Sequence, residues 1–182
     1  MQHRPQPYQT APSKSNHYPN IFRRVGPLQS EVRSEPTSPV PTQGAVRLRV
    51  RYAECDPFGV AHHSSYVPWL EEGRTELLRG TGVTYAQLER EGVFLVITKL
   101  EVRYRRPIRY DDVVEVRTRV VGGSKIKIRH EYELALIERL GGAPDPGDPA
   151  TPADGICAVA STELACVDQT GRPRALPSWL AS

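Results

Sequence analysis

The sequence predicts an α+β fold in which one long helix is wrapped by a five-stranded antiparallel sheet. One observation is a strand-like alternation over residues 46–52, and another is a helical pattern that begins near residue 64. The third is that four further strand-like segments follow between Gly92 and the end of the chain. A strand, a helix and then antiparallel strands that cover the helix form an α+β architecture.

The first strand and the helix are recognised by two different periods. In residues 46–52 apolar side chains alternate with arginines, and the apolar set is Val46, Leu48, Val50 and Tyr52. Beyond residue 64 the apolar face of a helix recurs at Tyr66, Leu70, Gly73 and Leu77, widened by Trp69 and Leu78. Ser64 or Ser65 can cap this helix and Gly80 can end it. A short helix over 84–90, capped by Thr84, is expected to follow.

Four more strands are predicted, over residues 93–106, 113–121, 124–137 and 156–167. The pair Gly122-Gly123 predicts a two-residue hairpin turn between the second and third of them. In the third strand His130 falls on the apolar face, so we expect a hydrogen-bonded core histidine. Residues 141–154, rich in Gly, Pro and Asp, are expected to form an exposed loop.

The first 44 residues differ from the rest of the chain. They hold eight of the 17 prolines, few aliphatic side chains and no sustained periodicity. We therefore expect residues 1–44 to be a disordered Pro-rich extension and residues 45–182 to be the folded domain. The extension carries five basic and two acidic side chains, a difference equal to the whole net charge of +3. A neutral folded domain argues against nucleic acid as the partner.

The remaining composition points to a reduced, cytoplasmic protein without stable membrane insertion. No apolar run reaches membrane-spanning length, and no apolar segment follows the first basic residues as a secretory signal requires. The three cysteines, Cys55, Cys157 and Cys166, are odd in number and lack metal or redox spacing. Adjacent His62 and His63 are not accompanied by ligands at metal-binding spacing, so we expect no metal and no other cofactor.

The segment from Tyr52 to Tyr66 is the strongest candidate for chemistry. Asp56 precedes Pro57, which favours an extended backbone, and Gly59 permits a turn just before the helix begins. A helix start presents unpaired N–H groups and partial positive charge. A carboxylate beside such donors can attack or deprotonate a nucleophile while the donors hold an oxyanion. The same residues are also ordinary turn and cap residues, so spacing alone leaves both interpretations open.

Several short motifs in this order resemble the hotdog-fold 4-hydroxybenzoyl-CoA thioesterase family. They are Tyr-Ala-Glu-Cys-Asp-Pro-Phe-Gly-Val-Ala-His-His-Ser-Ser-Tyr from Tyr52, Glu-Glu-Gly-Arg-Thr-Glu-Leu-Leu from Glu71, Tyr-Arg-Arg-Pro from Tyr104, Asp-Asp from Asp111 and Arg-Ala-Leu-Pro from Arg174. Within that family the chain looks most like the acyl-CoA thioesterases associated with the Tol-Pal envelope system. The resemblance spans residues 46–180, and neither the extension nor the 141–154 loop has a clear counterpart.

The resemblance implies an acyl-CoA thioesterase that needs no cofactor. Asp56 would be the catalytic carboxylate, either as nucleophile or as general base, and His63 would donate its backbone N–H to the thioester carbonyl. Gly59, Val60, His62 and Tyr66 would lie beside the substrate, with His62 where the family commonly has a tyrosine. The resemblance also implies a homodimer or homotetramer with sites at subunit interfaces.

Other interpretations remain open at this stage. Cys55 could be a nucleophile activated by the nearby histidines, and Glu71 or Glu72 could be a catalytic carboxylate on the helix, as in other branches of the family. The CoA phosphates require cations, for which the candidates are Arg103, Arg105, Arg106, Lys125, Lys127 and Arg129. A non-catalytic hotdog protein that binds acyl carriers or envelope-system partners is the alternative function, and a hotdog dehydratase is a third.

Overall fold

The computed structural model describes residues 35–36 and 40–180. By its internal contacts the chain divides into two units, Met1–Val32 and Arg33–Ser182, and every described residue belongs to the second. Most of the predicted Pro-rich extension therefore lies outside the described residues. The first strand begins at Gln43, just ahead of the expected domain boundary at residue 45.

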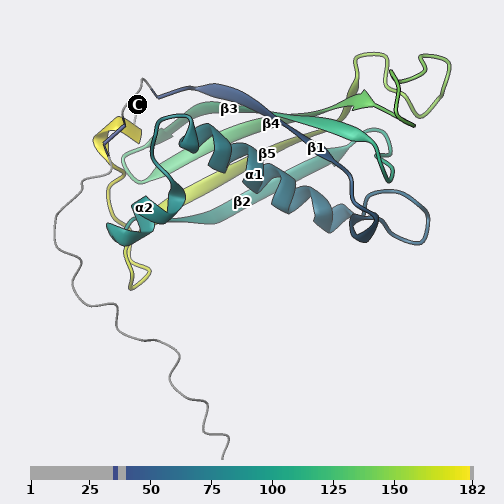
Figure 1. Ribbon diagram of the computed structural model, residues 1–182. Helices are drawn as coiled ribbons and strands as arrows, with labels where there is room; N and C mark the ends of the chain where they lie inside the picture. Colours follow the sequence, from purple (N-terminus) through teal and green to yellow (C-terminus); the bar gives the residue numbers. More distant parts are fainter. Residues whose placement is uncertain (1–34, 37–39, 181–182) are drawn as a thin grey trace, which may run out of the picture. The chain divides into compact units, whose positions relative to one another are not determined.

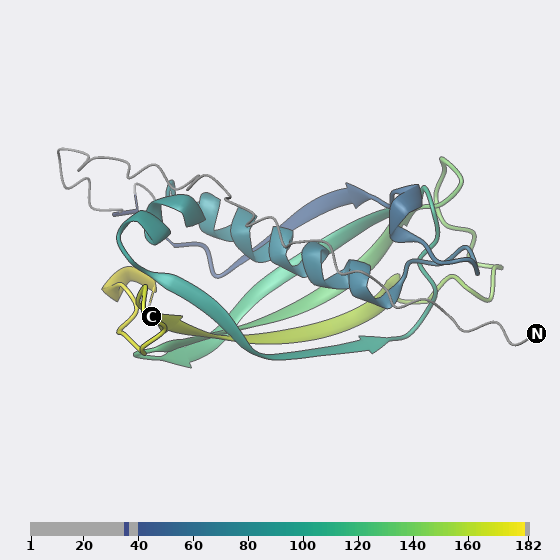
Figure 2. The ribbon, with the colours of Figure 1, turned by 90° about the horizontal axis from the view of Figure 1, so that it is seen from below.

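Five strands form one antiparallel sheet with one long helix against it (Figures 1 and 2). The strands are β1 (Gln43–Arg49), β2 (Phe94–Tyr104), β3 (Val113–Ser124), β4 (Lys127–Glu138) and β5 (Ile156–Val167). Their order in the sheet is β1-β3-β4-β5-β2, with antiparallel pairing throughout. The helices are α1 (Tyr66–Arg79) and α2 (Tyr85–Arg90). The predicted α+β hotdog architecture is confirmed.

The long helix α1 buries the face that its period predicted. Its buried residues are Tyr66, Trp69, Leu70, Gly73, Leu77 and Leu78. Gly73 faces the sheet so closely that a Cβ there would lie 2.5 Å from Thr118 Oγ1. The short helix α2 is capped by Thr84 as predicted, and Gln87 completes a capping box.

Two details of the strand predictions are wrong. Tyr52 does not continue the first strand but opens a 3-10 turn, Tyr52–Glu54 (η1), where its side chain is 81 % exposed. The pair Gly122-Gly123 is not the hairpin turn, because β3 runs through it and pairs with β4 as far as Ser124↔Lys127. A Cβ on Gly123 would collide with the backbone of Lys127, so that glycine permits close strand approach instead.

The core forms two clusters along the length of α1. One surrounds Tyr66, Trp69 and Leu70 at the start of the helix, and the other surrounds Leu78 and Leu88 near its end. All three cysteines are free thiols, with Cys157 and Cys166 buried. Across residues 40–180 no helix is long and apolar enough to cross a membrane.

Candidate active site

The segment between β1 and α1 folds into a turn that presents the Asp56 carboxylate. The N–H of Asp56 donates to the Val60 carbonyl at 2.9 Å, and the Gly59 N–H donates to the Asp56 carbonyl at 2.9 Å. Gly59 adopts a φ of +75°, which side chains disfavour. Asp56 Oδ1 accepts a hydrogen bond from the Phe58 N–H at 2.9 Å. The turn thus fixes the direction of the carboxylate, which retains further lone pairs for chemistry.

Glu54 ties this turn to the helix. Its Oε1 accepts hydrogen bonds from Trp69 Nε1 at 2.9 Å and Arg51 Nη2 at 2.7 Å. Its carbonyl accepts from the His62 N–H and from Ser65 Oγ, both at 2.8 Å. Burial alone would raise the pKa of Glu54, but the hydrogen bonds from Arg51 and Trp69 outweigh burial and lower it. Glu54 is therefore a buried, charged brace between the turn and α1.

A 3-10 turn, His63–Ser65 (η2), leads from the Asp56 segment into α1. His62 caps it, because its Nδ1 accepts from the Ser64 N–H at 3.3 Å and its carbonyl accepts from the Ser65 N–H at 2.9 Å. Ser65 occupies the predicted N-cap position of α1, but its hydroxyl bonds Glu54 rather than the helix. The Tyr104 hydroxyl donates to the His63 carbonyl at 3.2 Å, which anchors the turn to the end of β2.

A pocket of about 370 Å³ opens beside Asp56. Four of the predicted site residues line it: Asp56, Val60, His63 and Tyr66. The opposite wall is the end of β2 and the segment after it, with Tyr104, Arg105, Arg106, Pro107 and Ile108. Burial raises the pKa of the Tyr66 phenol, so this side chain is neutral at physiological pH. The arrangement combines a carboxylate, an imidazole and cations with an apolar floor.

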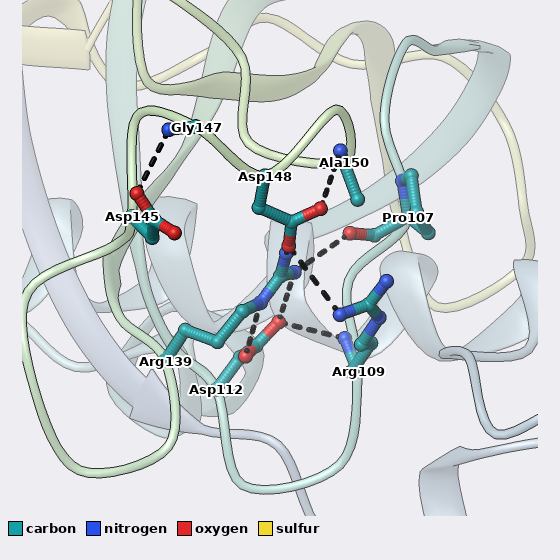
Figure 3. Close-up of polar contacts among 8 residues, drawn as sticks. All are labelled: Pro107, Arg109, Asp112, Arg139, Asp145, Gly147, Asp148 and Ala150. Atoms are coloured by element: carbon teal, nitrogen blue, oxygen red, sulfur yellow. Dashed lines mark hydrogen bonds and ion pairs between the residues drawn. The ribbon is translucent and has the colours of Figure 1, made fainter.

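A buried ion pair braces this opposite wall (Figure 3). Arg139 Nε donates to Asp112 Oδ1 at 3.0 Å, and Nη2 donates to Asp112 Oδ2 at 2.8 Å and to the Pro107 carbonyl at 3.0 Å. Arg139 Nη1 reaches Asp148 Oδ2 at 3.2 Å. The braced segment pairs with the Asp56 turn, since the Ala61 N–H donates to the Ile108 carbonyl at 2.8 Å. Arg139 thus joins the 141–154 loop to the pocket wall, together with the ion pairs of Arg109 with Asp148 at 3.5 Å and of Arg105 with Asp154 at 2.8 Å.

Not every predicted residue reaches the pocket. Gly59 shapes the turn and His62 caps η2, and neither lies among the residues that line the pocket. Sequence reasoning gave Tyr104 no role, although the Tyr-Arg-Arg-Pro motif marked its position. It also missed Glu54 as a brace, for which a lone acidic residue in a turn gives no signal.

The alternative catalytic residues fit the geometry less well. Burial raises the pKa of the Cys55 thiol, and its Sγ lies 3.8 Å from the Arg51 carbonyl, away from the pocket lining. Glu71 is exposed and pairs with Arg74 at 2.8 Å, and Glu72 is also exposed. Neither glutamate lines the pocket beside Asp56.

The candidate cations divide between the two ends of the sheet. Arg105 and Arg106 line the Asp56 pocket. Lys127 pairs with Ala165 on β5, and Tyr104 pairs with Ala158 on the same strand. Lys127 and the pocket residue Tyr104 are therefore about 20 Å apart along the strands. Lys127 is also engaged with Glu163 at 2.6 Å. Within one chain, Lys125, Lys127 and Arg129 are not among the residues that line the Asp56 pocket.

Comparison with known proteins gives the family. The sequence model of the thioesterase-like superfamily matches residues 50–182. The chain belongs to the thioesterase-like superfamily. The acyl-CoA thioester hydrolase YbgC of Escherichia coli O6:H1 is 31% identical over 136 residues, which cover 74% of this chain and 90% of that protein. The putative acyl-CoA thioesterase YneP of Bacillus subtilis is 27% identical over 72% of this chain and 88% of its own length.

Solved structures share this fold. A DHNA-CoA thioesterase from Staphylococcus aureus superposes with a TM-score of 0.62 at 29% identity, covering 74% of this chain and 80% of that one. The hypothetical protein TT1821 from Thermus thermophilus gives a TM-score of 0.61 at 32% identity, over 76% of this chain and 92% of that one. The prediction of a hotdog-fold thioester hydrolase is confirmed at the level of the superfamily.

Proposed function

We propose that this thioesterase-like protein hydrolyses acyl-CoA thioesters, with Asp56 as the catalytic carboxylate. The observation that carries the proposal is that Asp56 and His63 line one pocket at the start of α1. The relatives named as acyl-CoA thioesterases support the substrate class. The motifs around Asp56 support a place in the 4-hydroxybenzoyl-CoA thioesterase family, in the group associated with the Tol-Pal system.

The chemistry requires a nucleophile, an oxyanion donor and a leaving group. As a general base, Asp56 takes a proton from water while the resulting hydroxide adds to the thioester carbonyl carbon. As a nucleophile, it adds to that carbon itself and water later cleaves the anhydride. Either route breaks the carbon–sulfur bond, releases the CoA thiolate and leaves a free acid.

The start of η2 supplies the candidate oxyanion donor. His62 occupies the N–H groups of Ser64 and Ser65, so the His63 N–H is the donor that this turn can direct at a carbonyl oxygen. Such donors lower the barrier because they are already oriented when charge develops. Val60, Ile108 and Tyr66 would contact the acyl group, and Arg105 and Arg106 would meet the phosphates of CoA.

The decisive experiment replaces the carboxylate alone. We expect Asp56→Asn to lower thiol release from acyl-CoA by roughly two to four orders of magnitude, the usual loss for a general acid or base. Because Asp56 is only half-buried, the melting temperature should change little. Assaying short, long and aromatic acyl-CoAs would define the acyl group. Near-normal turnover in Asp56→Asn would contradict the assignment, and full cellular function with lost turnover would favour a non-catalytic acyl-carrier or interaction protein.

We further propose a homodimer or homotetramer. β2 is an edge strand whose large apolar side chains Val96, Ile97, Leu100 and Tyr104 are exposed. Exposed apolar edges favour pairing with another chain, and the pocket wall at Tyr104 lies on this strand. Light scattering at assay concentration should give at least a dimer, and an active monomer would contradict the proposal.

A further inference from the structure

An acidic residue at the end of the 141–154 loop lies against an arginine of the Asp56 pocket. Arg105 directly follows β2, and its N–H donates to the Cys157 carbonyl on β5 at 2.8 Å. Asp154 lies two residues before β5 begins, so the pairing of β2 with β5 brings the two side chains together. Arg105 Nη1 and Asp154 Oδ2 form an ion pair of 2.8 Å. A carboxylate of the loop therefore occupies a cation that lines the pocket.

A second carboxylate keeps the middle of this loop at the pocket wall (Figure 3). Asp148 Oδ2 pairs with the buried Arg139 at 3.2 Å and with Arg109 at 3.5 Å. Arg139 also donates to the carbonyl of Pro107, which is itself one of the residues that line the pocket. The loop is thus fixed beside the wall by ion pairs that do not involve Asp154.

The Asp154 carboxylate is oriented, charged and accessible. Its Oδ1 accepts a hydrogen bond from the Ile156 N–H at 3.0 Å, which leaves Oδ2 for Arg105. The Ile156 N–H and the Arg105 guanidinium both lower the pKa of Asp154, so this side chain is an anion at physiological pH. The Arg105 and Asp154 side chains are 39% and 51% exposed. Exposed ion pairs contribute little to stability, so another anion can replace Asp154 at small cost.

Arg106, the next residue, is bonded differently. It also lines the pocket, but its Nη1 donates to the Arg105 carbonyl at 2.9 Å rather than to a carboxylate. A phosphate that binds Arg105 must therefore displace an anion, whereas one that binds Arg106 Nη1 displaces a neutral carbonyl. The two neighbouring arginines thus differ in what an incoming phosphate has to replace.

We propose that Asp154 is a specificity-determining residue, which competes with phosphate groups of the substrate's thiol carrier for Arg105. The inference rests on the proposed thioesterase function and concerns the part of the substrate remote from the reacting carbon. A phosphate carries more charge than a carboxylate and matches the guanidinium fork with two oxygens, so it can take Arg105 from Asp154. The exchange reduces the gain from that contact. Asp154 therefore lowers the affinity for a phosphate-bearing carrier such as CoA without penalising a carrier that brings no phosphate to this wall.

Calorimetric titration of the full chain with CoA tests this competition without requiring turnover. Asp154→Asn should bind CoA roughly two- to fivefold more tightly, a range set by the modest strength of exposed ion pairs. Asparagine keeps an oxygen that can accept from the Ile156 N–H, so the loop conformation should persist. Pantetheine has the thiol arm of CoA without its phosphates and should bind the parent and the variant equally. Asp145→Asn is the matched control, because it removes a carboxylate of the same loop that bonds the Gly147 N–H at 2.8 Å.

A double-mutant cycle ties the expected gain to Arg105. Arg105→Met should weaken CoA binding, and adding Asp154→Asn to it should give no gain, because the cation for which the two anions compete is gone. In an Arg106→Met background the gain from Asp154→Asn should persist. With acyl-CoA as substrate, Asp154→Asn should raise kcat/KM through a lower KM, and this measurement alone depends on the proposed function.

Several results would overturn the proposal. They are CoA affinity that Asp154→Asn leaves unchanged, an equal gain in Asp145→Asn, an equal gain for pantetheine, a gain that survives Arg105→Met, and a failure of CoA to bind either chain. A parent chain that hydrolyses acyl-CoA but shows one of these results would keep the proposed function and lose this inference. A chain that binds CoA more tightly after Asp154→Asn but hydrolyses no acyl-CoA would do the reverse.

Discussion

Replacing Arg139 by methionine should strongly destabilise the protein. The Arg139 and Asp112 side chains are 6% and 2% exposed, and two hydrogen bonds of 2.8 and 3.0 Å join them. Methionine keeps much of the apolar stem but leaves the Asp112 carboxylate with the Arg109 N–H, at 2.7 Å, as its remaining partner. Breaking a buried pair in this way costs about 3–5 kcal/mol, because the remaining charge is neither hydrated nor neutralised.

Thermal unfolding followed by circular dichroism measures this loss. For a domain of this size, about 3–5 kcal/mol corresponds to a fall in melting temperature of about 10–20 °C. Arg117→Met is the matched control, because Arg117 makes ion pairs with Glu115 and Glu133 while 46% exposed. Exposed pairs contribute about 0–1 kcal/mol, so this control should melt within a few degrees of the parent.

The double substitution Asp112→Leu with Arg139→Met tests whether the unpaired Asp112 carboxylate causes the loss of stability. Removing both charges removes the unpaired carboxylate, so the double variant should be more stable than Arg139→Met alone. The physical argument would be refuted by an Arg139→Met protein that melts within about 3 °C of the parent. A double variant less stable than the single one would refute it as well.

Two further predictions concern packing and the domain boundary. Gly73→Ala should lower stability by about 1–3 kcal/mol despite the better helix propensity of alanine, because the new methyl group would overlap Thr118 Oγ1. Glu72→Ala, at an exposed position of the same helix, is the control. A Gly73→Ala protein that melts at the temperature of the parent chain would contradict the close approach. A chain that begins at Val40 should melt like the full chain, whereas one that begins at Ala45 should melt lower, because it loses the hydrogen bond from the Val120 N–H to the Thr42 carbonyl and the Gln43↔Arg119 pairing. Equal stability of the two truncated chains would place the boundary at residue 45.

Elements with a clear period could be predicted from sequence. The buried face of α1 follows from apolar spacing alone, and Ile156–Val167 was predicted to the residue. The predicted hairpin turn at Gly122-Gly123 is wrong, because glycine occurs both in turns and where strands approach closely. The turn falls two residues later, at 125–126, and the close contact comes from Lys127 at the start of the next strand.

Only one side of the candidate site, the segment around Asp56, could be predicted from the sequence. Pro57 and Gly59 predicted the Asp56 turn, because proline restricts the residue before it to extended conformations and glycine permits a positive φ. The opposite wall, from Tyr104 to Ile108, reaches the pocket through tertiary pairing that residue types do not specify. His130 shows the same limit: alternation predicted its burial, but not that its Nδ1 has no hydrogen-bond partner among the described residues.

The order of strands in the sheet has a consequence for synthesis on the ribosome. In the described chain β2 pairs with β5 alone, and β5 is the last strand to be made. The apolar edge of β2 therefore waits without its intramolecular partner while β3 and β4 are translated, a period in which unpaired strands are prone to misassociation. Tyr104 at the end of β2 takes its final position only when Ala158 arrives beside it. The residues of the Asp56 turn are thus made early, but the pocket wall at Tyr104 is completed only once the C-terminal strand has emerged.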